Sequence, residues 1–155
     1  MSEHIVERAI IMAAGIGQRL RPVTLTAPKP LATVNGVCMI DTNIAALRKN
    51  GIHEIYVVVG YLKEQFYEWA KKYSGVTLIE NPWYAKCNNI ASLYVARECL
   101  NNAIVLDGDQ VIRNPRSFTG NLPLLVLLCL DAQRYKRMAA DSRRRDRDKM
   151  QPYRR

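Results

Sequence analysis

Two kinds of apolar pattern alternate along residues 1–115, and this alternation constrains the fold more than any other feature of the chain. Short continuous apolar runs, typical of strands buried on both faces of a sheet, are followed by stretches with apolar residues at helical spacing. The expected strands are Val6–Ala14, Ile55–Val59, Val76–Ile79 and Ala103–Leu106; the expected helices are Met39–Asn50, Leu62–Tyr73 and a stripe from Ile90 to Leu100. This order predicts right-handed crossovers and a Rossmann-like, three-layer α/β/α fold with a mainly parallel sheet.

Glycine or acidic residues follow three of these strands directly. The segments are Gly15–Arg21, Gly60 and Asp107–Asp109. In parallel sheets, ligands bind beyond the carboxyl ends of the strands. We therefore expect the three segments to share one rim of the sheet and to form the ligand site there.

The first of these segments has the composition of a phosphate-binding loop. Gly15 and Gly17 follow a buried strand, so the backbone can turn sharply and its N–H groups can approach an anion without a Cβ in the way. Arg19 can add a planar, bidentate contact to phosphoryl oxygens. The segment lacks the Gly-Lys-Ser/Thr of a Walker A loop, and Leu20 replaces the third glycine of the dinucleotide fingerprint. Gly-x-Gly alone also fits an ordinary turn between a strand and a helix.

The continuation of this loop carries a more specific signature. The fixed positions are Gly15, Gly17, Arg19, Leu20, Pro22, Thr24, Pro28, Lys29 and Leu31. In this pattern the chain resembles the sugar-phosphate and choline-phosphate nucleotidyltransferases. The resemblance runs from about Ala9 to Pro115 and implies a nucleotide-diphospho-sugar transferase-like fold, here incomplete at the C-terminal end.

The same resemblance implies roles for individual residues. It places the nucleotide over Ala13, Ala14, Gly15 and Gly17, with Arg19 on the triphosphate and Lys29 on the α-phosphate. Arg19 and Lys29 are then the catalytic residues, because positioning and charge neutralisation carry most of the catalysis in phosphoryl-type transfer. No covalent nucleophile is needed for this chemistry.

Asp107 and Asp109 are the candidate metal ligands. Mg²⁺ prefers hard oxygen ligands and commonly takes one or two carboxylates together with substrate phosphates. The resemblance places the metal ligand at Asp109, and Asp107 either contacts the groups that bind the metal or is an alternate ligand. By itself, Asp-Gly-Asp also fits a solvated turn.

An asparagine-containing segment narrows the resemblance to cytidylyltransferases for choline phosphate and aminoethylphosphonate. Within Gly60–Leu93, the resemblance places Asn88, Asn89 and Ser92 near the base and ribose. Asn88-Asn89 before a helical stripe fits a helix N-cap equally well. Trp83 and Tyr84 could stack on a quaternary ammonium group, but we interpret them as packing residues.

The expected reaction transfers a cytidylyl group from CTP to a small phosphorylated alcohol such as phosphocholine, with Mg²⁺ as cofactor and pyrophosphate as the product released. Two alternatives stay open within the same family: a sugar-1-phosphate nucleotidyltransferase and an inactive nucleotide-binding remnant. The nucleotide, the acceptor and the oligomeric state are not determined by the sequence.

The net charge of +9 is concentrated in the last forty residues. Residues 1–115 contribute +2, whereas residues 116–155 contribute +7. We expect residues 1–115 to be the nucleotide-binding part and residues 116–155 to be an atypical, poorly ordered basic tail of a truncated or frame-shifted chain. The reason is that Asp141–Arg155 is rich in Arg and Asp and has almost no apolar residues. The tail arginines would allow nucleic-acid binding, an alternative weakened by the interleaved aspartates.

Four scattered cysteines and the longest apolar run indicate where the protein acts. Cys38, Cys87, Cys99 and Cys129 lack the spacing of a disulfide framework or a zinc site, so we expect reduced thiols in a cytoplasmic protein. Leu122–Leu130 is much shorter than the roughly 20 residues that span a bilayer, so no membrane partner is expected.

Overall fold

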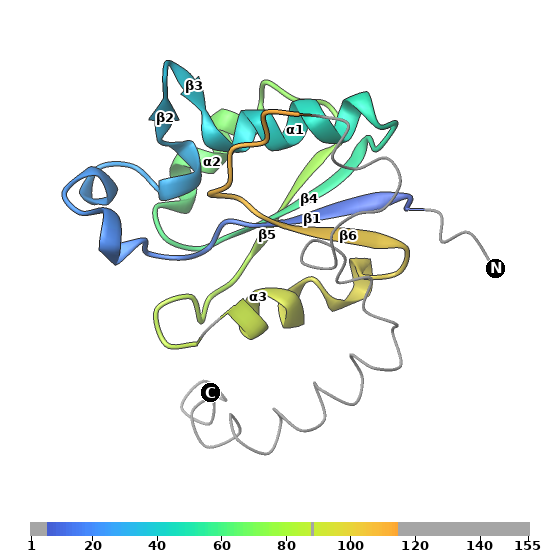
Figure 1. Ribbon diagram of the computed structural model, residues 1–155. Helices are drawn as coiled ribbons and strands as arrows, with labels where there is room; N and C mark the ends of the chain where they lie inside the picture. Colours follow the sequence, from blue (N-terminus) through green and yellow to red (C-terminus); the bar gives the residue numbers. More distant parts are fainter. Residues whose placement is uncertain (1–5, 88, 115–155) are drawn as a thin grey trace, which may run out of the picture.

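A four-stranded parallel sheet forms the centre of the molecule (Figure 1). The structure is a computed structural model that describes residues 6–87 and 89–114. The strands are β1 (Arg8–Met12), β4 (Glu54–Val59), β5 (Val76–Glu80) and β6 (Ala103–Asp107), in the spatial order β5-β4-β1-β6. β1 pairs in parallel with both β4 and β6, and its Ile11 lies between Val57 and Leu106. The predicted parallel sheet is therefore confirmed.

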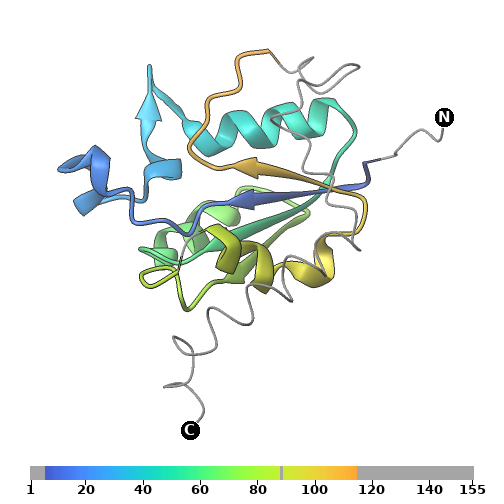
Figure 2. The same ribbon diagram turned by 60° about the horizontal axis from the view of Figure 1, so that its bottom comes forward.

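Helices cover both faces of this sheet, as Figures 1 and 2 show. The helices α1 (Met39–Lys49) and α2 (Lys63–Ala70) lie on one face, and α3 (Asn89–Val95) lies on the other. The three layers of the predicted Rossmann-like fold are thus present. Among the described residues, no helix is long and apolar enough to cross a membrane.

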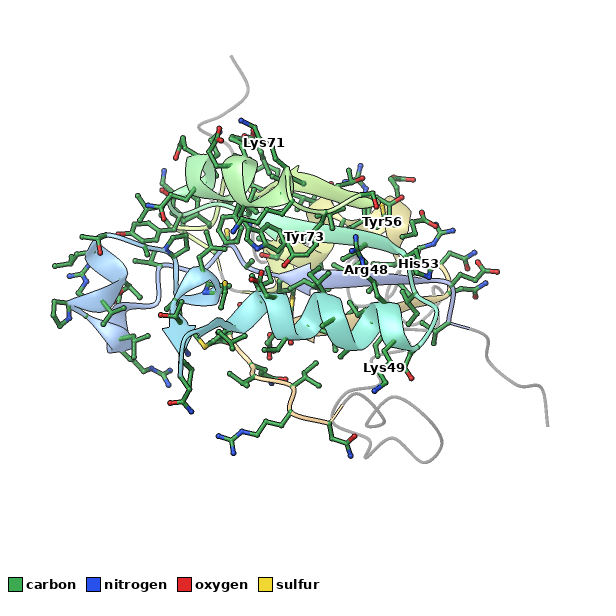
Figure 3. All side chains as sticks on the ribbon, turned by 90° about the horizontal axis from the view of Figure 1, so that it is seen from above. Arg48, Lys49, His53, Tyr56, Lys71 and Tyr73 are labelled. Carbon is green, nitrogen blue, oxygen red and sulfur yellow. The ribbon has the colours of Figure 1, made fainter. Side chains whose placement is uncertain are left out.

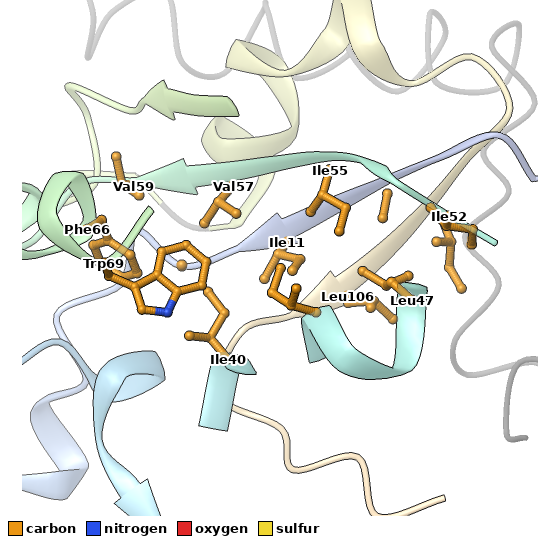
Figure 4. Packing of buried hydrophobic residues seen from close by; sticks show 14 residues of the cluster. Ile11, Ile40, Leu47, Ile52, Ile55, Val57, Val59, Phe66, Trp69 and Leu106 are labelled. Carbon is orange, nitrogen blue, oxygen red and sulfur yellow. The ribbon is translucent and has the colours of Figure 1, made fainter. Parts of the chain in front are cut away.

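The larger core lies between the sheet and the α1–α2 layer (Figure 4). Ile11 and Val57 from the sheet pack there against Ile40 and Leu47 of α1 and against Phe66 of α2. Ile10 points to the opposite face, where it packs with the α3 layer. Successive strand residues thus enter different cores, because side chains alternate along a strand. This explains why the strands are continuous apolar runs.

The seam between α1 and α2 is closed by polar and aromatic side chains (Figure 3). Trp69 of α2 donates a hydrogen bond from Nε1 to the Asp41 carboxylate of α1 at 2.6 Å. The Arg48 guanidinium lies over the Tyr73 ring, 5.2 Å from its centroid. Burial, followed by a hydrogen bond with Asp41, raises the pKa of Tyr73 to about 12. These contacts fix the two helices that cover the larger core.

Two helical segments are shorter than the sequence pattern predicted. The apolar stripe from Ile90 to Leu100 forms α3 and then a separate 3-10 turn, η4 (Arg97–Cys99), because Ala96 leaves the helical conformation. The second helix begins at Lys63 rather than Leu62, whose φ of 50° lies in the left-handed region, and it ends at Ala70 rather than Tyr73. The end of α1 is close to the prediction, and Gly51 follows it with φ of 76°.

The connection between β1 and α1 contains structure that was not predicted. Three 3-10 turns, η1 (Gln18–Leu20), η2 (Val23–Leu25) and η3 (Lys29–Leu31), precede a small hairpin of β2 (Thr33–Val34) and β3 (Val37–Cys38). Asn35 and Gly36 form its two-residue turn, and both have positive φ. Asn-Gly is a common sequence for such a turn. The basic tail and the apolar run Leu122–Leu130 lie outside the described residues.

Candidate active site

The three segments expected at one rim do meet there. Gly15 follows β1, Gly60 follows β4, and Asp107 is the last residue of β6, with Gly108 and Asp109 after it. β1 lies between the other two strands. Backbone hydrogen bonds connect the segments: Gly108 N–H donates to the Met12 carbonyl at 2.9 Å, and Tyr61 N–H donates to the Ala14 carbonyl at 3.1 Å. The carboxyl ends of three parallel strands thus form one continuous surface.

A pocket opens at this rim between β1, β6 and the start of α3. It is lined by Met12, Ala13, Ala14, Gly15, Gly17, Lys29, Pro30, Asn89, Ser92, Asp107 and Asp109. Most of the residues predicted to bind the nucleotide or the metal therefore surround a single cavity. Arg19 is not part of this lining; it is exposed on η1. Asn88 lies outside the described residues, so its predicted contact with the base or ribose stays a prediction.

Gly15 and Gly17 differ in the space that a side chain would have at each position. A Cβ at Gly15 would meet nothing within 4 Å, so the backbone there faces open space beside the pocket. Gly17 has φ of +65°, and a Cβ there would lie 3.0 Å from Thr24 Cγ2 and 3.2 Å from Lys29 Cβ. Gly17 is therefore needed for both its left-handed conformation and its close packing.

Lys29 and Asp109 form an ion pair across the pocket although they are 80 residues apart in sequence. The Lys29 side chain is 35% exposed and that of Asp109 is 36% exposed, so both charged groups remain accessible from the cavity. Burial, and then the negative charge of Asp109, raises the pKa of Asp107, while Lys29 opposes this shift. The pocket thus combines one ammonium group with two closely placed carboxyl groups.

This donor set fits a hard divalent cation. Two carboxyl groups in one pocket that has room for further ligands are the kind of site in which Mg²⁺ shares its coordination with substrate oxygens. Residues 6–87 and 89–114 contain no group of three or more His, Cys, Asp or Glu side chains placed to hold a metal by themselves. Oxygen ligands from a bound substrate would therefore have to complete the coordination.

Two residues of helix α1 form hydrogen bonds with the segment that contains Asp107 and Asp109. The fully buried Asn43 donates from Nδ2 to the Asp107 carbonyl at 3.2 Å, and its Oδ1 is buried without a hydrogen-bond partner. The neighbouring Thr42 hydroxyl accepts from Ile112 N–H at 3.0 Å. These contacts hold the chain on both sides of Asp109. Sequence reasoning missed Asn43, because its place on the helix face looks like that of a core residue.

Ser92 lines the pocket, but its hydroxyl already has a partner. Asn81 Nδ2 donates to Ser92 Oγ at 3.1 Å, and Asn81 Oδ1 accepts from Trp83 N–H at 2.9 Å. Asn81 is buried, so it fixes the start of α3 against the segment after β5. Ser92 can still donate its hydroxyl proton toward the cavity, whereas Asn89 faces the cavity from the first turn of α3.

Trp83 and Tyr84 make ring contacts, as the packing interpretation expects. Trp83 lies against Tyr94 with 6.3 Å between ring centroids, and Tyr84 lies against Tyr61 at 6.4 Å. A Cβ at Gly60 would lie only 2.6 Å from the Cβ of Tyr84. The tyrosine therefore closes over the glycine that ends β4, and Gly60 is needed for this approach.

A family model described as nucleotidyl transferase matches residues 8–121, which include every described residue of the pocket. The chain belongs to the nucleotidyl transferase family. Its position in this family agrees with the fold predicted from the alternating pattern and with the signature that begins at Gly15.

Two curated relatives at 48% identity are cytidylyltransferases. The 2-aminoethylphosphonate cytidylyltransferase of Lancefieldella rimae is 48% identical over 112 residues, which cover 71% of this chain and 46% of the relative. The choline-phosphate cytidylyltransferase of Streptococcus pneumoniae is 48% identical over 105 residues, which cover 68% of this chain and 45% of the relative. The chain thus spans about half the length of the curated relatives it matches.

Two solved nucleotidyltransferase structures are similar to this chain. The CTP:phosphocholine cytidylyltransferase of Streptococcus pneumoniae superposes with a TM-score of 0.68 at 46% identity, covering 72% of this chain and 48% of that one. A glucose-1-phosphate thymidylyltransferase described from Bacillus anthracis superposes with a TM-score of 0.60 at 20% identity, and this likeness concerns the fold alone.

Proposed function

We propose that this chain binds CTP in the rim pocket and takes part in cytidylyl transfer to a small phosphorylated or phosphonate acceptor. The observation that carries the proposal is the Lys29–Asp109 pair, which sets an ammonium group and a carboxylate beside the glycine-rich turn in one pocket. The relatives at 48% identity are named as cytidylyltransferases, which supports CTP over other nucleotides as the donor.

In the proposed reaction, an acceptor oxygen attacks the α-phosphorus of CTP. A new oxygen–phosphorus bond forms, the bond from the α-phosphorus to the bridging oxygen breaks, and pyrophosphate leaves with its electron pair. Lys29 stabilises the charge that develops on the α-phosphate, and the backbone N–H groups near Gly15 and Gly17 bind phosphate oxygens. Arg19, exposed on η1, binds the outer phosphates when the nucleotide is present.

Asp109 and Asp107 would hold Mg²⁺, which would neutralise negative charge on the phosphates when bound. Asn89 and Ser92 face the cavity from α3, and we propose that they bind the ribose or the base. The acceptor is phosphocholine or 2-aminoethylphosphonate, the two acceptors that the relatives' names indicate. The free thiols of Cys38, Cys87 and Cys99 among the described residues support action in the cytoplasm.

Thermal unfolding with each of four nucleoside triphosphates and Mg²⁺ tests this proposal. A ligand that binds only the folded state stabilises it by roughly 2.7 kcal/mol at a concentration of 100 times its Kd. We expect CTP to raise the melting temperature by several degrees more than ATP, GTP or UTP. Equal shifts for all four would contradict cytidine selectivity, and no shift with any of them would contradict nucleotide binding at this site.

A further inference from the structure

The segment between β1 and β2 that carries Arg19 and Lys29 has little core of its own. We call residues 15–31 the loop segment. Its buried residues are Thr24, Pro28 and Pro30, while Arg19 and its neighbours on η1 are exposed. Short 3-10 turns contribute few hydrogen bonds. The position of the loop segment must therefore be fixed by contacts from outside it.

Tyr61 supplies two of these contacts. It follows Gly60 at the end of β4, and its phenol donates a hydrogen bond to the Thr24 carbonyl at 2.8 Å. Its backbone N–H donates to the Ala14 carbonyl at 3.1 Å, immediately before the loop segment begins. A single residue thus connects the start of the loop segment with its middle.

Thr24 in turn contacts Gly17 through its side chain. The residue is only 1% exposed, and its hydroxyl donates to the Gly17 carbonyl at 3.0 Å. Its methyl group occupies the space beside Gly17 that a Cβ would need. Gln65 of α2 adds a more exposed contact, from Nε2 to the Thr26 carbonyl at 2.7 Å. Hydrogen bonds therefore run from β4 through Tyr61 and Thr24 to the glycine turn.

We infer that Tyr61 is a positioning residue that holds the loop segment in its triphosphate-binding shape. Tyr61 does not line the pocket, so it acts through Thr24 and Gly17 rather than on the ligand. Binding is tighter when the binding groups are already ordered, because less conformational freedom is lost. This inference rests on the proposed function, since it assigns the glycine turn and Arg19 to the triphosphate.

The test replaces Tyr61 with phenylalanine and measures the affinity for CTP and for CMP by calorimetry with Mg²⁺. Loss of one neutral hydrogen bond corresponds to a change of roughly three- to tenfold in an equilibrium constant. We expect Tyr61→Phe to weaken CTP binding by about that factor and to leave CMP binding unchanged, because CMP lacks the outer phosphates. Gln65→Ala, which removes the more exposed contact, should give a smaller loss in the same direction.

Tyr56→Phe is the matched control. It removes a phenol from β4 itself, where the Tyr56 hydroxyl donates to Glu54 at 2.6 Å, near the end of the strand that lies away from Tyr61 (Figure 3). CTP affinity should not change in this variant.

The outcomes separate the two proposals. An equal loss of CTP and CMP affinity in Tyr61→Phe, or no loss of either, would overturn the positioning role while leaving the proposed function intact. Failure of the unsubstituted chain to bind CTP would overturn both.

Discussion

Replacing Lys29 with methionine is expected to weaken CTP binding by about ten- to a hundredfold, because a hydrogen bond to a charged group is worth roughly 1.5–3 kcal/mol. Methionine keeps most of the length of the side chain but removes the ammonium group. The substitution also leaves Asp109 without its partner in the pocket. Calorimetric titration of CTP with Mg²⁺ measures the effect.

Lys49→Met provides the control for this measurement. Lys49 is the last residue of α1 and is exposed at the end of the molecule away from the loop segment (Figure 3). Lys49→Met changes the net charge by the same amount as Lys29→Met, but Lys49 does not line the pocket. Equal CTP affinities in the Lys29→Met variant and the unsubstituted chain would show that Lys29 does not contact the nucleotide.

Phe66→Ala is expected to cost about 3–5 kcal/mol of unfolding free energy, the usual range for removing a buried aromatic side chain. Phe66 is fully buried between α2 and the sheet, and its ring meets that of Trp69 edge-on with 6.2 Å between centroids (Figure 4). The cavity left by alanine would lie beneath the helix that carries Gln65. Urea denaturation measures the change.

The next residue on the same helix gives the comparison. Tyr67 is 36% exposed, and its phenol bonds to the exposed Glu80. Tyr67→Ala should cost less than about 1 kcal/mol, because surface contacts contribute little to stability. Similar losses for the two variants would mean that the face of α2 that packs on the sheet has been assigned wrongly.

The sequence predicted the central sheet well because its strands are buried on both faces. Ile10 and Ile11 enter opposite cores, so an unbroken apolar run was the only pattern that could satisfy both layers. The β2–β3 hairpin was missed because each strand has two residues, too few to show a period of two. The stripe through Leu100 looked like one helix because apolar spacing continues into η4, where the backbone tightens.

The candidate site was predictable where its residues belong to a local pattern. Gly15, Gly17 and Lys29 lie in one short signature. Asp107 and Asp109 lie at the end of β6, a strand that was itself predictable. The residues that hold the site in place through hydrogen bonds were not predictable in this way. Asn43 and Tyr61 donate hydrogen bonds to backbone carbonyls far away in sequence. Any residue has such a carbonyl, so only the folded arrangement shows which one is reached.

The proposed CTP site is tested most directly by a crystal structure of this chain grown with CTP and Mg²⁺. We predict that the triphosphate lies over Gly15 and Gly17, that the Lys29 ammonium contacts the α-phosphate, and that Mg²⁺ is bound by Asp109 or by both Asp107 and Asp109. A nucleotide bound away from this pocket, or a triphosphate that contacts neither Lys29 nor the glycine turn, would contradict the proposed function.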